Sequence, residues 1–226
     1  MNELKENILW RALAGAQQGF ATGGAEALRY APGFPPLVAF ADYARPNLGA
    51  IEPFCEPGEH LYCAGWSGAS PVGWQVEAET SMFRMVWAGP MPAVDEAPDA
   101  VQLGSEHADQ ALELGTLTRP GPLGRRTVEL GDYFGYFDGP RLVAMAGERL
   151  FTGAFREISG VCTHPDYQGR GLARRLMLKL VRRQLLRREQ PFLHVMRDNV
   201  NARRLYQGMG FEVLTESVVR VIARYG

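Results

Sequence analysis

The chain has 226 residues, of which 24 are basic and 25 acidic, so its formal net charge is −1. This length allows one large domain or two small ones, and the balanced charge gives no overall field that would attract nucleic acid or an anionic membrane. The three cysteines are an odd number without metal-like spacing, which predicts no metal site and is typical of the reducing cytoplasm.

The first part of the chain predicts a helix at 4–17 and strands at 37–40, 61–66 and 83–87. Its first residues carry charges of both signs and no apolar core, so no secretory signal is expected. The longest uncharged run, 61–76, contains glycines, serines and a proline, which excludes a membrane helix. These features predict a cytoplasmic α+β protein.

Two short segments suggest an internal repeat. Gly73-Trp74-Gln75-Val76 precedes an alternating strand pattern, and so does Gly210-Phe211-Glu212-Val213. The first 95 residues can be read as a degenerate half-copy of the C-terminal fold without a cofactor site, or as an unrelated α+β cap with a chance match. The sequence leaves both interpretations open.

A proline- and acid-rich stretch at 89–98 predicts a linker. It divides an N-terminal α+β domain, 1–95, from a C-terminal domain, 96–226. The second part predicts, in order, a strand at 100–103, helices at 105–117 and 126–130, a hairpin of 133–137 and 142–149, a strand at 155–163, a helix at 171–188, a strand at 192–196, a helix at 201–209 and closing strands from Phe211.

The turn between the strand at 155–163 and the following helix has the pattern Gln168-x-x-Gly171-x-Ala173. A glycine-bearing strand-to-helix turn directs backbone N–H groups and the positive end of a helix dipole at one point. Gly169 and Gly171 allow close approach of a ligand. No Gly-Lys-Ser/Thr follows, so this is not a Walker loop, but a phosphate-bearing ligand is expected.

A second pattern lies downstream: Asn199-x-x-Ala202-x-x-Leu205-Tyr206-x-x-x-Gly210-Phe211. Together the two patterns resemble the acyl-CoA-binding elements of the GNAT superfamily of acyl-CoA-dependent N-acyltransferases. The resemblance covers the C-terminal part, and the overall arrangement is similar to glycine N-acyltransferase-like members. It implies the GNAT fold, an α+β architecture with a mixed, mostly antiparallel twisted sheet flanked by helices.

The resemblance also implies where acetyl-CoA, or another acyl-CoA, would bind. In the family two neighbouring parallel strands splay apart, and the pantetheine arm pairs with main-chain groups, here those of Val161, Cys162 and Thr163. The pyrophosphate would lie on Gln168, Gly169, Arg170, Gly171, Leu172 and Ala173, and Asn199 would bind the pantetheine amides. For Arg170 a solvated surface role competes, and for Asn199 an N-cap role can hold as well.

Transfer to an amine needs a group that accepts a proton and a group that protonates the departing thiolate. Glu157 lies where some family members carry a general-base glutamate, and burial beside Phe155 and Ile158 would raise its pKa. An ion pair with an arginine is the alternative role of Glu157. Tyr206 matches the family's thiolate-protonating tyrosine. Cys162 is not expected to be a nucleophile.

Residues 118–126 are expected to border the acceptor site, and Arg119 and Arg125 would suit an anionic acceptor. The predicted function is N-acyl transfer, of an acetyl or other short acyl group, from acyl-CoA directly to a primary amine of an amino acid, small amine or protein. The alternative is an acyl-CoA-binding sensor or scaffold without turnover. The sequence leaves a homodimer open.

Overall fold

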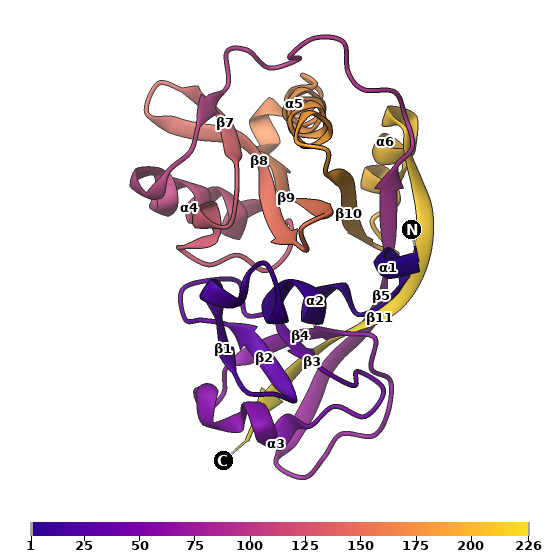
Figure 1. Ribbon diagram of the computed structural model, residues 1–226. Helices are drawn as coiled ribbons and strands as arrows, with labels where there is room; N and C mark the ends of the chain where they lie inside the picture. The colour runs from indigo at the N-terminus through magenta and orange to yellow at the C-terminus, as the bar shows by residue number, and fades with distance from the viewer. Residues whose placement is uncertain (1, 226) are drawn as a thin grey trace.

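The computed structural model describes residues 2–225 (Figure 1). The helices are α1 (Asn2–Lys5), α2 (Ile8–Ala14), α3 (Leu48–Ile51), α4 (Ala108–Thr118), α5 (Leu172–Leu186) and α6 (Val200–Met209), with 3-10 turns at Gln18–Phe20, Glu52–Phe54, Ser105–His107, Thr127–Glu129 and Pro165–Tyr167. The strands are β1 (Ala21–Gly23), β2 (Ala27–Tyr30), β3 (Val38–Phe40), β4 (His60–Ala64), β5 (Trp74–Trp87), β6 (Val101–Gln102), β7 (Tyr133–Asp138), β8 (Arg141–Phe151), β9 (Phe155–Thr163), β10 (Gln190–Met196) and β11 (Phe211–Arg224).

Within these residues the main sheet has eight strands in the order β4-β11-β5-β10-β9-β8-β7-β6. Its one parallel pair is β9 with β10, and the other neighbours are antiparallel. The predicted α+β class, with a mixed, mostly antiparallel sheet flanked by helices, is confirmed.

The longest ladder joins β5 to β11, from the pair Phe211↔Trp87 to the pair Arg224↔Trp74. Each of these strands follows a glycine with positive φ, Gly73 or Gly210. The two similar segments seen in the sequence are therefore the starts of two antiparallel strands that pair with each other. In Figure 1 these strands run beside both halves of the molecule, and α1 and α2 lie between the halves.

The N-terminal half repeats the strand topology of the C-terminal half. Strands β1, β2 and β3 form an antiparallel sheet, and an isolated parallel bridge, Leu37↔Tyr62, joins it to β4. In the N-terminal half the strands β1, β2, β3 and β4 are followed by β11 and then β5. In the C-terminal half the strands β7, β8, β9 and β10 are followed by β5 and then β11. Both halves thus share the long β5/β11 pair, entered from opposite sides. This topology favours the half-copy interpretation over an unrelated cap.

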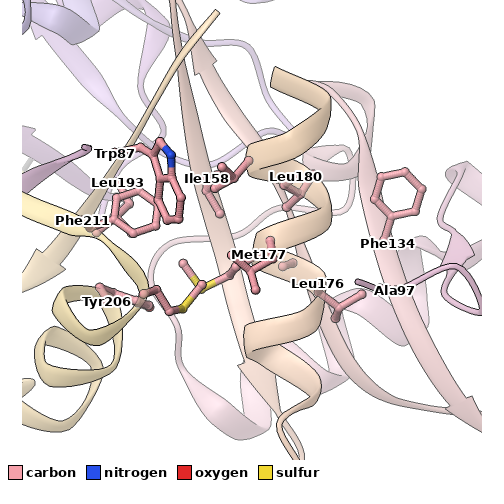
Figure 2. Packing of buried hydrophobic residues seen from close by; sticks show 14 of the residues in the cluster. Trp87, Ala97, Phe134, Ile158, Leu176, Met177, Leu180, Leu193, Tyr206 and Phe211 are labelled. Carbon is pink, nitrogen blue, oxygen red and sulfur yellow. The ribbon is translucent and has the colours of Figure 1, made fainter. Parts of the chain in front are cut away.

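The core of the C-terminal half lies between the sheet and helices α5 and α6. Leu176, Met177 and Leu180 of α5 pack against Ile158 of β9 and Leu193 of β10 (Figure 2). Apolar side chains at spacings of three and four along α5 form this buried face, which fixes the helix across the parallel pair. The turn that precedes α5 is thereby held at the end of β9.

The segment predicted as a linker, 89–98, crosses over α5. Lys179 Nζ donates to Asp95 Oδ2 at 2.5 Å and to the Ala97 carbonyl at 3.1 Å, and Ala97 is fully buried. Arg175 donates to the Glu96 carbonyl at 2.9 Å and to Asp99. The segment is fixed to the helix, and the strands on either side of it, β5 and β6, belong to one sheet.

The single helix predicted at 4–17 is wrong, because the chain breaks between α1 and α2. Asn7 caps α2 by accepting a hydrogen bond from Trp10 N at 3.4 Å. Arg84 of β5 donates to the carbonyls of Leu4 and Glu6. A side-chain cap and a buried donor together satisfy backbone groups that a continuous helix would have paired internally.

Candidate active site

The parallel strands β9 and β10 pair over only four residues and then part. Their ladder ends at the pair Leu193↔Ile158, whereas β8 pairs with the other edge of β9 as far as Thr163. Residues 159–163 therefore have no strand partner on the β10 side. Main-chain groups left in such a gap need another hydrogen-bonding partner. Val161, Cys162 and Thr163 lie in this stretch, where the resemblance places the pantetheine arm.

The glycine turn at the end of β9 leaves the N-terminus of α5 open. Gly169 and Gly171 have φ of 75° and 74°, and an added Cβ at either would meet no atom within 4 Å. No side chain caps α5, which begins with Leu172 and Ala173. The first N–H groups of the helix are thus available for an anion. This geometry fits the pyrophosphate of acyl-CoA.

Two exposed side chains flank the turn. Gln168 Nε2 lies 3.5 Å from the Thr163 carbonyl oxygen. The guanidinium of Arg170 donates to the Asp166 carbonyl at 3.1 Å and lies 4.7 Å from the centre of the Tyr167 ring. Arg170 is therefore held along the loop that carries the glycines, and its charge adds to that of the helix terminus.

Asn199 and Tyr206 lie on α6, across the gap from β9. Asn199 Oδ1 accepts a hydrogen bond from Ala202 N at 3.1 Å, so the residue is the N-cap of the helix. The Tyr206 ring packs edge-on against Phe211, with 6.2 Å between the ring centres (Figure 2). Burial raises the pKa of Tyr206 to about 12. Its hydroxyl is consequently protonated at neutral pH and able to donate.

A cavity of about 660 Å³ begins at this gap and continues into the N-terminal half. At the gap it is lined by Ser159, Gly160, Val161, Val195, Asn199 and Tyr206. In the N-terminal half it is lined by Val38 and Ala39 of β3, by Cys63 and Ala64 of β4, and by Gly65. Residues 168–173 lie outside this lining. One cavity thus connects the parted strands β9 and β10 with the parted strands β3 and β4.

Glu157 is fully buried on β9 and does not line the cavity. Its carboxylate accepts two hydrogen bonds from Arg149, at 2.9 and 2.7 Å, and lies 2.7 Å from His194 Nδ1. The predicted rise in its pKa is wrong. Although burial alone would raise it, the Arg149 guanidinium and the hydrogen bond from His194 hold the pKa of Glu157 well below its usual range.

Two cavity-lining residues that the sequence analysis missed extend this network. His194 of β10 accepts a hydrogen bond at Nε2 from Arg84 Nε, at 2.9 Å, while its Nδ1 faces Glu157. Burial lowers the pKa of His194, so the ring is neutral at pH 7, with its proton on Nδ1. One feature of the sequence could have indicated these two residues: each is a polar residue among apolar ones on the same face of a strand, as in Met82-x-Arg84-x-Val86.

The two arginines predicted to bind the acceptor are in different surroundings. Arg119 ends α4 with a φ of 50° and lines the cavity, as do Pro120, Gly121 and Pro122. Arg125 forms an ion pair with Asp109 and is not part of the lining. Of the two, Arg119 alone is placed to meet a ligand in this cavity.

The buried cysteine of β9 is not activated. Burial raises the pKa of Cys162 to about 11, which leaves it a thiol at neutral pH. Within residues 2–225 no group of three or more histidine, cysteine, aspartate or glutamate side chains could hold a metal ion. No helix in the same range is long and apolar enough to cross a membrane.

The chain is similar over its whole length to a solved structure from Novosphingobium aromaticivorans that is assigned to the GNAT family as an acetyltransferase. The two are 30% identical over 99% of each chain, with a TM-score of 0.89. The chain belongs to the GNAT superfamily. The FR47-like protein family also matches residues 133–221, which contain β9, the glycine turn, α5 and α6.

Two further GNAT structures share the fold at low sequence identity. A GCN5-related N-acetyltransferase from Kribbella flavida has a TM-score of 0.60 at 12% identity, covering 97% of this chain and 96% of its own. A GCN5-related N-acetyltransferase-like protein from Streptococcus suis has a TM-score of 0.61 at 14% identity, covering 97% and 93%. None of the curated proteins matches the chain. GNAT membership supports acyl transfer from acyl-CoA and leaves the acceptor open.

Proposed function

We propose that this protein is an N-acyltransferase that transfers an acetyl or other short acyl group from acyl-CoA directly to a primary amine. One observation carries the proposal. A single cavity joins the unpaired edge of β9 to Asn199 and Tyr206 of α6 and continues into a second chamber. The first part suits the acyl-bearing arm of CoA, and the second has room for an acceptor.

The amine must lose a proton before it attacks, and deprotonation of a lysine-type amine at pH 7 costs about 4–5 kcal/mol. Glu157 is buried behind His194, so the proton reaches this pair at His194 Nε2, which becomes free to accept it when Arg84 Nε turns from the ring to the ligand. Because the pKa of Glu157 is held low, its carboxylate stays ionised and stabilises the charged imidazole. The pair acts as the base, and Glu157 orients and supports His194.

Tyr206 protonates the departing thiolate. When the tetrahedral intermediate collapses, the C–S bond breaks and the phenol proton moves to the sulfur of CoA. The ring is held by Phe211, and its hydroxyl has no hydrogen-bond partner among the described residues. A thiol ordinarily has a pKa near 8.5, so a neutral phenol positioned beside it is a suitable acid.

The N-terminal half supplies the chamber for the acceptor. Residues 41–47, which follow β3, hold no glycine, and α3 has only four residues and is capped by Asn47. This half therefore lacks the open helix terminus that suits a pyrophosphate. In this proposal residues 96–226 carry the CoA-binding residues, and 1–95 shape the acceptor side together with β11 and the loop at Arg119.

The alternative is a protein that binds acyl-CoA without turnover. Calorimetry with acetyl-CoA, together with a thiol-release assay against amino acids, polyamines and peptides, separates the two. Binding with thiol release that depends on an amine supports the enzyme. Binding without release for any amine favours the sensor, and no binding of acetyl-CoA refutes both.

A further inference from the structure

Arg84 is a buried cation on the wall of the acceptor chamber. It is 5% exposed, lines the cavity, and lies on β5 directly opposite His194 in the β5–β10 ladder. Its guanidinium is next to the point where β9 and β10 part, because Arg84 Nε lies 2.9 Å from His194 and His194 lies 2.7 Å from Glu157 of β9.

Among the side chains that the structure describes, no carboxylate is in contact with Arg84. Nε donates to the neutral ring of His194, and Nη1 donates to the main-chain carbonyls of Leu4 and Glu6. Nη2 has no hydrogen-bond partner within the described residues, although the side chain lines the cavity. Glu157, whose charge reaches Arg84 across His194, is already bound by Arg149 through both of its oxygens.

The other buried arginines differ in this respect. Arg29, 3% exposed, donates to both carboxylate oxygens of Glu59, and Arg220, 7% exposed, donates to Glu79. A charge removed from water needs a counter-charge, and without one burial is costly. Burial lowers the pKa of Arg84 to about 10, as expected for a cation whose partners are mostly neutral.

We propose that the missing counter-charge is a carboxylate on the acceptor, so that the acceptor is an amino acid rather than a simple amine. The carboxylate would accept hydrogen bonds from Arg84 Nε and Nη2, so that Nε leaves His194 and the adjacent amine can lie at His194 Nε2. This inference rests on the proposed transferase function and specifies its substrate class. It also links binding to catalysis, because an anion beside Arg84 removes the repulsion that opposes protonation of His194.

The wall beyond Arg84 is more apolar farther from it. On the cavity side of β5, Met82 faces Ser217 of β11, Thr80 faces Val219 and Ala78 faces Val221. The apolar members of this wall suit a hydrocarbon or aromatic group. The acceptor class is therefore an α-amino acid with an apolar side chain.

Product analogues test this proposal even while the natural acceptor is unidentified. N-acetyl-leucine, N-acetyl-methionine and N-acetyl-phenylalanine are titrated by calorimetry, with and without saturating CoA, beside the matching carboxamides. The acids should bind at least about tenfold more tightly than the amides, since a charge-assisted hydrogen bond contributes about 1.5–3 kcal/mol. Equal binding of acid and amide, or no binding of either, overturns the proposal.

Variants assign the preference to Arg84. Arg84→Gln should abolish it, whereas Arg220→Gln, at a buried arginine outside the cavity lining, should retain it. Persistence of the preference in a folded Arg84→Gln protein contradicts the assignment. If that variant does not fold, the comparison of acid with amide in the unaltered protein still decides. Binding of CoA in the same titrations reports separately on the acyl-CoA site, and amine-dependent thiol release reports on the transferase function.

Discussion

The two places where parallel strands part in this protein have the same topology but different surroundings. The β9/β10 ladder ends at Ile158, and β9 is followed by a turn in which Gly169 and Gly171 have positive φ and by a helix of fifteen residues without a side-chain cap. The β3/β4 contact is a single bridge, followed by a four-residue helix that Asn47 caps. The two gaps therefore differ in the helix terminus beside them, and we propose that the open terminus of α5 is what makes one of them suitable for CoA.

The largest expected effect is on stability, and it differs between the ion pair of Arg149 with Glu157 in the C-terminal half and that of Arg29 with Glu59 in the N-terminal half. Glu157→Gln leaves Arg149 buried without its counter-ion, which should destabilise the protein by about 3–5 kcal/mol and lower the melting temperature by about 10 °C. The matched change Glu59→Gln should cost less, because Glu59 is 25% exposed and water can reach Arg29. Thermal unfolding checks both, and equal losses would contradict the difference in burial.

The pH dependence follows from the same carboxylate. The folded-state pKa of Glu157 lies below its ordinary value of 4.5. Its contribution to stability is therefore complete above pH 4.5 and is lost as the pH falls below that value. Chemical unfolding between about pH 7 and pH 3 should show a steeper acid loss in the unaltered protein than in Glu157→Gln. Parallel curves would refute the assigned pKa shift.

The next effect concerns a tyrosine at each end of the cavity. Tyr206→Phe retains the ring packing and removes the acid, so kcat should fall about a hundredfold, equivalent to roughly 2–3 kcal/mol of barrier, while acetyl-CoA still binds. Tyr62→Phe, on β4 in the N-terminal chamber, should leave kcat unchanged. Steady-state kinetics and calorimetry measure these quantities. Full activity of Tyr206→Phe would mean that another group protonates the thiolate.

A smaller effect tests the glycine turn. Gly171 and Gly58 have φ of 74° and 73°, and an added Cβ at either meets no atom within 4 Å. Alanine at either position should cost about 1 kcal/mol of stability through backbone strain. Only Gly171→Ala should also weaken acetyl-CoA binding, by about tenfold. Equal affinities in the two variants would argue against an anion site at the start of α5.

The smallest effect concerns the cavity mouth. Arg119→Ala should raise the KM of the acceptor several-fold, by about 1 kcal/mol, through loss of an exposed charge. Arg125→Ala should leave it unchanged, since Arg125 pairs with Asp109 outside the lining. The KM of acetyl-CoA should be the same in both variants. An effect of Arg125→Ala equal to that of Arg119→Ala would place the acceptor elsewhere.

Local sequence patterns located the glycine turn and the start of α6 better than the buried polar network behind the cavity. The glycine turn and the Asn199–Tyr206 segment are continuous in sequence, so their chemistry can be read from neighbouring residues. The network of Arg84, His194 and Glu157 joins three strands, and its hydrogen bonds depend on the β5–β10 and β9–β10 registers. No local pattern specifies those registers. The pKa of Glu157 was predicted in the wrong direction because its partner Arg149 comes from β8, and the sequence did not indicate that Arg149 would face Glu157 across the β8–β9 pair.

In the fold, too, elements set by neighbouring residues were predicted correctly, whereas pairings between distant residues were not. The strand at 155–163 was predicted at its observed bounds, because it lies between clear turn signals. The position of β5 between β10 and β11 was not foreseen, since pairing of residues more than a hundred positions apart leaves no signal in a single sequence. The helix at 4–17 failed for a related reason, because Arg84, which holds its break, comes from a distant strand.

The long strand β11 comes from the end of the C-terminal half but pairs with β4 of the N-terminal half, and this has a consequence for synthesis on the ribosome. Strand β4 has β11 as its antiparallel neighbour, so the N-terminal half lacks that strand until residue 224 has been made. The N-terminal half therefore cannot complete its fold as it emerges, and its apolar edge stays uncovered until β11 has been made. We expect the two halves to fold together, in one late and cooperative step.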